Sequence, residues 1–390
     1  MVTTLAAAAA VTLVIAGIST LVARVPDHSA PPAGAKRAAA FSAVPTTLPF
    51  GDKSGTYDAA RKSLWVLTRD PPTNAVTLSQ VAVGSGRTRN WPVATDPSGY
   101  RTSAVAIDGK GAVWLGLGRS VVRFKPSTSK FTRWDIPTSL APAAGVLADG
   151  GLVALLPRDD GVHVLVSGLS RLITLAPGRP SPWALGPRLS VRPTYGSRLI
   201  ALGSGEELVS GGVSVPGGEW QPAVARVSGT SSQTQPGLAA CVAQGPTAAV
   251  CTASDGSISK LQDTATPIPG ATVKEVRLRL ATAGSGHLWT WSAGLNRAVV
   301  IDTDTGTGRQ ASISFPLDTV TGDRARFDIS GVGPVAHQPA PSGPVTISIN
   351  PGPQALVVAG SELWLLTYSG ISPRDPTAKA AYAAAYRVHL

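Results

Sequence analysis

The stretch SAVAIDGKGAVWLGLGRSVVRFKPSTSKFTRWDIP, residues 103–137, decides the fold. Four short runs of aliphatic, β-branched and aromatic residues alternate in it with turns made of Gly, Asp, Pro and Ser. The aliphatic, β-branched and aromatic residues favour strands, and the Gly, Asp, Pro and Ser residues favour tight turns between antiparallel strands. The stretch therefore predicts one small sheet of four antiparallel strands.

Comparable units recur along the chain, and the fourth and fifth of the seven are weaker copies. Their ranges are 55–94, 143–176, 186–229, 237–270, 276–316 and 346–390. Units of about 40–50 residues have the length of a four-stranded propeller blade. The sequence predicts an all-β fold, a seven-bladed β-propeller over residues 51–390, with six or eight blades as alternatives. A β-sandwich would not account for the recurring Gly-x-x-Trp runs.

Four tryptophans, Trp65, Trp114, Trp289 and Trp364, occupy one position of the repeat. A single four-stranded sheet leaves apolar faces exposed, and neighbouring blades cover them. We therefore expect these side chains to pack between blades. An aromatic platform for sugars is the alternative.

Composition narrows the class of protein. The 390 residues include 42 Gly and 33 Pro and only 15% charged residues, which excludes coiled coils and long salt-bridged helices. A Pro/Gly-rich insertion at 317–346 separates the last two units. Insertions in propellers often project from one face and carry binding function, and a plain variable loop is the alternative.

The N-terminus predicts a membrane segment. Thr4 to Ala23 is uncharged and long enough to cross a bilayer as a helix, so residues 1–24 are expected to be a transmembrane anchor or a signal segment. The apolar region exceeds that of a typical cleaved signal, which favours a retained anchor. Residues 25–50, rich in Ala and Pro, predict an extended tether.

Orientation depends on two opposing features. Arg24, Lys36 and Arg37 follow the apolar segment and would keep the remainder of the chain in the cytoplasm. The body of the chain has the character of an exported fold, and we expect export. The predicted location is a bacterial cell membrane, crossed once, with the propeller outside the cytoplasm.

Two cysteines, Cys241 and Cys251, flank the segment AQGPTAAV. A hairpin centred on residues 245–247 would place them directly opposite each other, at a separation close to that of a disulfide. We expect a disulfide in an oxidising compartment. Two buried thiols are the alternative.

The unit at 111–137, G-x-V-W-L-G-L-x-x-S-V-V-R-F-x-P-x-T-x-x-F-x-x-W-x-I-P, resembles the repeat of the streptogramin-lyase-like propellers and of two-component sensor propellers. The resemblance implies the fold. Lyases of this group open a cyclic depsipeptide lactone by elimination, with Mg²⁺ and His and Glu side chains, and commonly carry an acid three residues after the Trp. The matched positions here are Thr68, Leu117, Ser292 and Thr367.

None of these positions is acidic, so the resemblance does not extend to the lyase site. Elimination needs a base near the proton, and Mg²⁺ needs oxygen ligands. His163 and His287 precede strand runs and are expected to orient neighbours or to lie at turns. Asp302 to Gly306 has the form of a calcium-loop fragment, but a hairpin turn explains it. No catalytic, cofactor or metal residue is assigned.

The net charge of +11 is spread along the chain, which argues against nucleic acid as a partner. The expected function is a non-enzymatic binding platform for an envelope protein or an anionic polymer. One alternative is a lyase or hydrolase, which predicts His and carboxylates converging in the central funnel. A ligand sensor, which needs a cytoplasmic output, is the other.

Overall fold

The fold is taken from a computed structural model that describes most of residues 39–389. The described ranges are 39–42, 44–46, 48–49, 51–70, 73–95, 103–140, 151–194, 196–244, 248–253, 255–261, 265–272, 281–284, 286–292, 297–305, 308–314, 318–323, 327–329, 344–349, 353–367, 371–373 and 385–389. The chain divides into two compact units, Met1–Ala38 and Ala39–Leu390, and all described residues belong to the second.

The predicted membrane segment, residues 1–24, lies outside the described residues. Within the ranges given above, no helix has the length and apolar character needed to cross a membrane.

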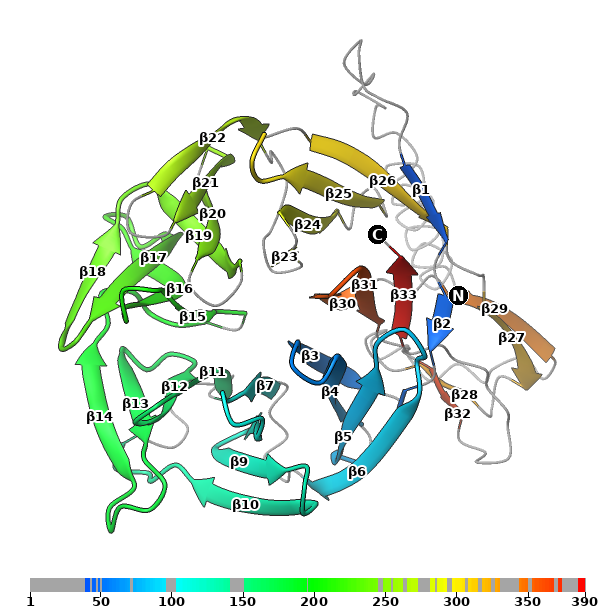
Figure 1. The fold of residues 1–390 in the computed structure, drawn as a ribbon, viewed down its shortest axis with the longest axis horizontal. Coiled ribbons are helices and arrows are strands. Elements are labelled where there is room, and N and C mark those ends of the chain that lie inside the picture. The colour runs from blue at the N-terminus through cyan, green and yellow to red at the C-terminus, as the bar shows by residue number, and fades with distance from the viewer. Residues whose placement is uncertain are drawn as a thin grey trace, which may run out of the picture. The chain divides into compact units, whose positions relative to one another are not determined.

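Seven sheets are arranged around a closed ring (Figure 1). Their innermost strands contact one another in cyclic order, from β3 through β7, β11, β15, β19, β23 and β30 and back to β3. The predicted all-β, seven-bladed propeller is confirmed, and the alternatives of six or eight blades are wrong.

The strands of the first four blades follow one another along the chain. Blade 1 contains β3 (Asp52–Asp58), β4 (Ser63–Arg69), β5 (Ala75–Ala82) and β6 (Thr88–Thr95). Blade 2 contains β7 (Ser103–Ile107), β8 (Val113–Leu117), β9 (Ser120–Lys125) and β10 (Lys130–Asp135). Blade 3 contains β11 (Leu152–Arg158), β12 (Gly161–Val166), β13 (Arg171–Leu175) and β14 (Trp183–Arg188). Blade 4 contains β15 (Leu199–Ala201), β16 (Glu207–Ser214), β17 (Trp220–Ser228) and β18 (Ser231–Gln235).

Blade 5 is also built from consecutive strands, whereas blades 6 and 7 each include one strand from the start of the unit. Blade 5 contains β19 (Leu238–Ala243), β20 (Ala249–Ala253), β21 (Ser257–Leu261) and β22 (Ala265–Thr272). Blade 6 contains β23 (Ala281–Gly284), β24 (His287–Ser292), β25 (Arg297–Asp302), β26 (Gly308–Ser314) and β1 (Ala39–Ser42). Blade 7 contains β30 (Pro353–Ala359), β31 (Glu362–Thr367), β33 (Ala385–His389) and β2 (Val44–Thr46).

The position of a strand in its blade explains its composition. β4, with the sequence SLWVLTR, is buried at every residue because neighbouring blades cover both faces of an inner strand. β10, the outermost strand of blade 2, is exposed or half-buried throughout and carries Lys, Thr, Arg and Asp.

The ring is closed by the segment before β3. β2 pairs antiparallel with β33 and supplies the outermost strand of blade 7, while β1 pairs parallel with β26 of blade 6. Both strands come from the end of the segment expected to be a tether, residues 25–50. Pro45 is tolerated because β2 is an edge strand, where no further partner needs its missing N–H. The two strands cover sheet edges that would otherwise be free to pair with other chains.

Two small sheets lie outside the blades. β27 (Asp318–Asp323) pairs with β29 (Pro344–Ile349), and β28 (Phe327–Ile329) pairs with β32 (Ile371–Pro373) (Figure 1). β27, β28 and most of β29 fall within or beside the predicted insertion, 317–346. The seventh predicted unit, 346–390, begins within β29. That strand pairs with β27 and is not part of blade 7.

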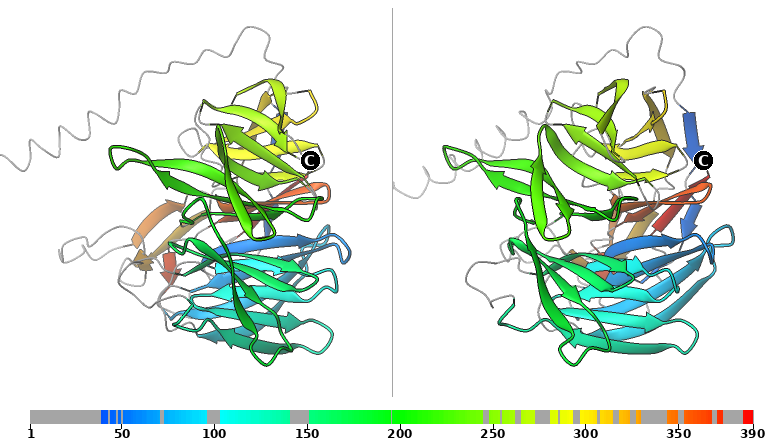
Figure 2. Two further views of the ribbon diagram at one scale, coloured as in Figure 1. Left: turned by 90° about the vertical axis from the view of Figure 1, so that its left-hand side faces the viewer. Right: turned by 60° about the vertical axis from the view of Figure 1, so that its left-hand side comes forward.

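Because successive strands of a blade run in opposite directions, the turns between them lie on two faces of the ring, which Figure 2 shows edge-on. The turns between first and second and between third and fourth strands share one face, here called the hairpin face. The turns between second and third strands and the connections between blades share the other, here called the connection face. A residue's place in its strand therefore fixes the face on which it lies.

Candidate functional site

A recurring contact joins neighbouring blades through their second strands. One residue of each second strand points toward the next blade, and the residue before it points toward the previous blade. At four interfaces the contact joins a tryptophan to an aliphatic residue in one buried cluster: Trp65 with Val113, Trp114 with Val162, Trp289 with Leu363, and Trp364 with Leu64. The four tryptophans are at most 4% exposed.

Two more interfaces use aliphatic residues at both positions. Leu208 of blade 4 shares a cluster with Ala249 of blade 5, and Val250 of blade 5 shares one with Leu288 of blade 6. These four residues are fully buried. Six of the seven interfaces are therefore apolar at this repeat position.

The interface between blades 3 and 4 differs. His163 of β12 occupies the tryptophan position, and Glu207 of β16 occupies the aliphatic position. His163 Nδ1 lies 2.6 Å from Glu207 Oε1, and Arg158 Nε lies 3.2 Å from the same oxygen. The Glu207 side chain is 4% exposed, that of His163 21% and that of Arg158 23%. A buried carboxylate thus replaces an apolar side chain.

This arrangement orients the imidazole. Because a carboxylate only accepts hydrogen bonds, Nδ1 of His163 is the donor, which leaves Nε2 as the acceptor in the neutral ring. A carboxylate that fixes the tautomer and orientation of an imidazole is the arrangement used in general acid–base catalysis. The second carboxylate oxygen of Glu207, Oε2, is buried and has no hydrogen-bond partner within the described residues.

The residue before Glu207 is also acidic but has different partners. Glu206 accepts hydrogen bonds from Arg226 Nε at 2.7 Å and from Ser204 Oγ at 2.8 Å. These bonds hold the pKa of Glu206 below its ordinary value. Within the part of the chain that the structure describes, no serine, threonine or cysteine is hydrogen-bonded to His163. The His163–Glu207 pair can move a proton, but no nucleophile is hydrogen-bonded to it within the described residues.

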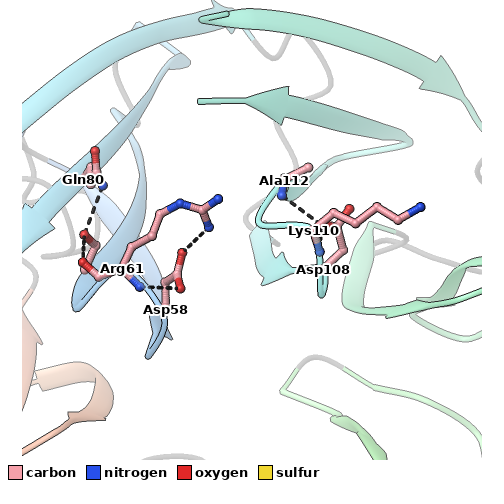
Figure 3. Close-up of polar contacts among 7 residues, drawn as sticks. Asp58, Arg61, Gln80, Asp108, Lys110 and Ala112 are labelled. Atoms are coloured by element: carbon pink, nitrogen blue, oxygen red, sulfur yellow. Dashed lines mark hydrogen bonds and ion pairs between the residues drawn. The ribbon is translucent and has the colours of Figure 1, made fainter. Parts of the chain in front are cut away.

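Acids at the corresponding turns of blades 1 and 2 are engaged in local structure (Figure 3). Asp58 accepts hydrogen bonds from the backbone N–H of Arg61 at 3.1 Å and from Arg61 Nη1 at 2.8 Å. Asp108 accepts from the backbone N–H groups of Lys110 and Ala112, at 3.0 and 2.8 Å. These carboxylates stabilise their turns.

The lyase-type positions contain no acid. Thr68 and Leu117 are buried, and the side chains of Ser292 and Thr367 lie outside the described residues. The matching position in blade 3, three residues after His163, is Val166, which is also buried. Within the described ranges, no three or more His, Cys, Asp or Glu side chains gather in a group that could hold a metal ion.

The sequence Asp302–Gly306 begins a hairpin turn where it is described. Asp302 Oδ1 accepts hydrogen bonds from the backbone N–H groups of Asp304 and Thr305, both at 2.8 Å. These bonds lower the pKa of Asp302. Asp304 pairs with Lys260 of blade 5, and His287 lies opposite Asp302 across β24 and β25.

The predicted disulfide is confirmed. Cys241 of β19 and Cys251 of β20 are directly opposite each other and are joined through their sulfur atoms. The predicted turn centre, 245–247, lies outside the described residues. The disulfide belongs to the core between blades 4 and 5.

A basic surface lies on the connection face where blade 3 meets blade 4. We call it the blade 3/4 basic surface, and it consists of Arg171, Arg188, Arg192 and Trp220. Arg171, the first residue of β13, and Arg188, the last of β14, are directly opposite each other and exposed. Among the described residues, none of the three arginines forms an ion pair with a carboxylate.

Trp220 is the most exposed large hydrophobic residue of this surface, at 52%. The Arg192 guanidinium lies 5.7 Å from the centre of its ring, and the ring packs against the backbone at Gly212, where a Cβ would lie 2.8 Å from an indole carbon. Glycine is therefore required under the ring. The contacts hold an aromatic side chain in place while half of it faces solvent.

Sequence analysis did not identify the His163–Glu207 contact or the exposed ring of Trp220. Glu207 lies outside the lyase-type positions, and His163 is 44 residues away from it. The one available signal was that Glu207 precedes Leu208 at a position filled by an apolar residue in the other blades. Trp220 does not fall at the tryptophan position of the repeat.

Comparisons with known proteins show the fold. No protein-family model matches the chain. No curated protein matches it either. Among solved structures, a catalytically inactive variant of virginiamycin B lyase from Staphylococcus aureus with quinupristin aligns at a TM-score of 0.58 and 11% identity, over 90% of this chain and 99% of that one.

A chain in a crystal structure of the mitotic checkpoint complex aligns at a TM-score of 0.50 and 9% identity, over 94% of this chain and 97% of that chain. At these identities the likeness is one of fold alone. The chain shares the propeller fold with a streptogramin lyase, in agreement with the resemblance of its repeat.

Proposed function

We propose that this protein is a non-enzymatic binding platform that takes an anionic polymer of the bacterial envelope. In this proposal residues 1–24 anchor the chain in the cell membrane, and the propeller lies outside the cytoplasm. The polymer binds on the connection face, at the blade 3/4 basic surface. The alternative partner is an envelope protein, and the experiment below distinguishes it from the polymer.

The observation that carries the proposal is the pairing of Arg171 with Arg188. Like charges directly opposite each other in a sheet are destabilising. Their repulsion is relieved when an anion lies between or beside them. Arg192 and Trp220 extend the surface with a third guanidinium and an exposed ring, which suits a chain of charged sugars better than a single small anion.

The disulfide supports the proposed compartment. Disulfides persist in oxidising surroundings and are rare in the cytosol of mesophilic cells. Thiol trapping in intact cells, followed by denaturation and labelling, tests this part. We expect Cys241 and Cys251 to be labelled only after reduction, and labelling of both without reductant would contradict export.

Polymer binding is tested with alginate, a polyuronate, and with dextran as the neutral control. Two double variants are compared with the wild type by co-sedimentation. R171S/R188S removes the pair on the basic surface. K125S/K130S removes another pair of exposed, directly opposed cations, on the hairpin face of blade 2, and is the matched control.

We expect the wild type to bind alginate and not dextran. R171S/R188S should bind roughly tenfold more weakly, since two lost charge contacts are together worth about 1.4 kcal/mol, while the control changes little. Equal loss in both variants would show binding by net charge alone. No binding of alginate by the wild type would turn the assignment toward a protein partner.

His163 and Glu207 favour a second candidate, a lyase or hydrolase. Their geometry supplies an oriented imidazole. The two residues lie in the second strands of blades 3 and 4, toward the hairpin face. The test is ring opening of quinupristin, followed by mass spectrometry, in the wild type and in His163→Gln. Turnover that is lost in the variant would favour the enzyme, and its absence in the wild type would argue against this substrate.

A further inference from the structure

A hollow of about 580 Å³ lies at the seam where the ring closes, between blade 7 and blade 1. Its size is that of small-molecule sites, which range from about 300 to 1,000 Å³. Its lining consists of Thr46, Leu48, Pro49, Ser85, Gly86, Thr88, Asn90 and Arg387. We call it the closure pocket. It is separate from the blade 3/4 basic surface and from the His163–Glu207 pair.

Three parts of the chain build the closure pocket. The segment that closes the ring supplies Thr46 of β2 together with Leu48 and Pro49, of which Leu48 is buried. The turn after β5 and the start of β6 supply the hydroxyl and amide side chains. Thr88 and Asn90 alternate with Arg89 and Trp91, and Trp91 packs into the cluster between blades 1 and 2. The side chains of Thr88 and Asn90 therefore lie on the opposite face of the sheet from Trp91, toward blade 7.

Arg387 of β33 gives the pocket its charge. Its Nη1 donates a hydrogen bond to the carbonyl oxygen of Gly84, and the same nitrogen lies 3.7 Å from Glu362 Oε1. Nε of Arg387 is buried and is therefore not presented to the pocket. Glu362 Oε1 is farther from Nη1 than a hydrogen bond reaches, and the Arg387 side chain is 18% exposed, so the charged guanidinium retains the capacity to bind an anion.

The carboxylate near Arg387 is itself shared. Glu362, which is 1% exposed, accepts a hydrogen bond from Trp364 Nε1 at 3.0 Å and lies 3.6 Å from His389 Nδ1. Its negative charge is therefore distributed over three partners. The positive charge of Arg387 is only partly neutralised.

We propose that the closure pocket binds a sugar that carries one negative charge, such as a uronic acid. The hydroxyls of Thr46, Ser85 and Thr88 and the amide of Asn90 both donate and accept, which suits a polyhydroxylated ligand. The guanidinium of Arg387 suits a carboxylate. Leu48 and Pro49 supply apolar surface for the C–H face of the ring.

Binding in this pocket is linked to closure of the ring. β2 pairs with β33, and each of these two strands contributes a side chain to the pocket. A ligand that binds only when both are in place stabilises the closed ring by mass action. We expect glucuronate to slow hydrogen exchange at the backbone amides of Val44 and Thr46.

Isothermal titration of the full chain with glucuronate, and with glucose as the neutral control, tests the proposal. Asn90→Ala removes a ligand contact from an exposed residue, so the fold should be retained. Thr132→Ala is the matched control, because Thr132 is the third residue of β10 as Asn90 is of β6, and both strands are outermost in their blades.

We expect glucuronate to bind more tightly than glucose, with roughly tenfold weaker binding in Asn90→Ala and unchanged binding in Thr132→Ala, as for the loss of a hydrogen bond to a ligand. Equal affinity of the wild type and Asn90→Ala for glucuronate would show that glucuronate does not bind in the closure pocket. Failure of the wild type to bind glucuronate at millimolar concentration would overturn the proposal. R171S/R188S separates the two proposals: it should leave glucuronate affinity unchanged, because neither arginine lines the closure pocket.

Discussion

His163 Nδ1 and Glu207 Oε1 are 2.6 Å apart across the interface between blades 3 and 4, where four other interfaces pack a tryptophan against an aliphatic side chain. Placing a carboxylate there costs desolvation free energy that an apolar pair does not. Arg158 and His163 offset that cost. The pair is thus a specific polar exception in an otherwise apolar ring of contacts.

Removing one partner of this contact should destabilise the protein. His163→Ala leaves Glu207 buried beside Arg158 alone, and we expect a loss of about 2–4 kcal/mol in the free energy of unfolding, slightly below the usual cost of an orphaned buried charge because Arg158 remains. Denaturant unfolding followed by tryptophan fluorescence measures the loss.

Replacing both partners gives the control. H163L/E207L restores apolar residues at both positions, and its stability should equal or exceed that of the wild type by about 1–4 kcal/mol. If the double variant is less stable than His163→Ala, the pair does not occupy the repeat position assigned to it.

The disulfide should stabilise blade 5 by a moderate amount. It joins residues ten apart in sequence, and the loop-entropy relation gives about 2–3 kcal/mol for a loop of that size. C241A/C251A should unfold at a correspondingly lower denaturant concentration, and added reductant should destabilise the wild type but not the variant. A variant as stable as the oxidised wild type would contradict this.

Burial lowers the pKa of Lys53 to about 7, with Asp52 acting weakly in the opposite direction. The unfolded chain, with a lysine pKa near 10.5, binds more protons than the folded chain between these values. Stability therefore rises with pH from about 7 to 10.5, by up to about 1.4 kcal/mol per pH unit from this group.

Lys53→Met removes that dependence. We expect it to be more stable than the wild type at pH 7, with the difference shrinking as the pH approaches 10. Lys62→Met, at an exposed lysine, is the control and should leave the pH profile unchanged. A difference between Lys53→Met and wild type that is constant across this range would show that Lys53 does not titrate there.

The opposed arginines of the blade 3/4 basic surface should cost stability. Arg188→Thr relieves the repulsion with Arg171 and puts a β-branched residue in an outer strand, so we expect a gain of about 0.2–1 kcal/mol. Thermal unfolding measures it. A loss of stability on this substitution would mean that the two side chains do not repel each other.

The repeat could be predicted from sequence because each blade carries its own strand and turn chemistry. Blade 2 shows this best, since all four of its strands lie within residues 103–137. The closure of the ring could not, because β2 has no strand pattern of its own. Val44-Pro45-Thr46 becomes a strand only where the edge of β33 is available to it.

The candidate sites depend on contacts between blades, which strand patterns do not report. The cysteine pair was predictable because one hairpin aligns both residues. His163 and Glu207 meet because two blades are stacked, and Arg387 reaches the closure pocket from the far end of the chain, 303 residues after Gly84. Such contacts follow from the ring and become visible only once it is assembled.

The salt dependence of alginate binding tests the central claim most directly. The binding constant is measured at several salt concentrations for the wild type and for R171S/R188S. The platform account predicts that binding by the wild type weakens steeply as salt rises, and that the variant binds more weakly at low salt and with a shallower dependence, because fewer counterions are displaced. The same affinity and the same slope in both proteins would contradict it.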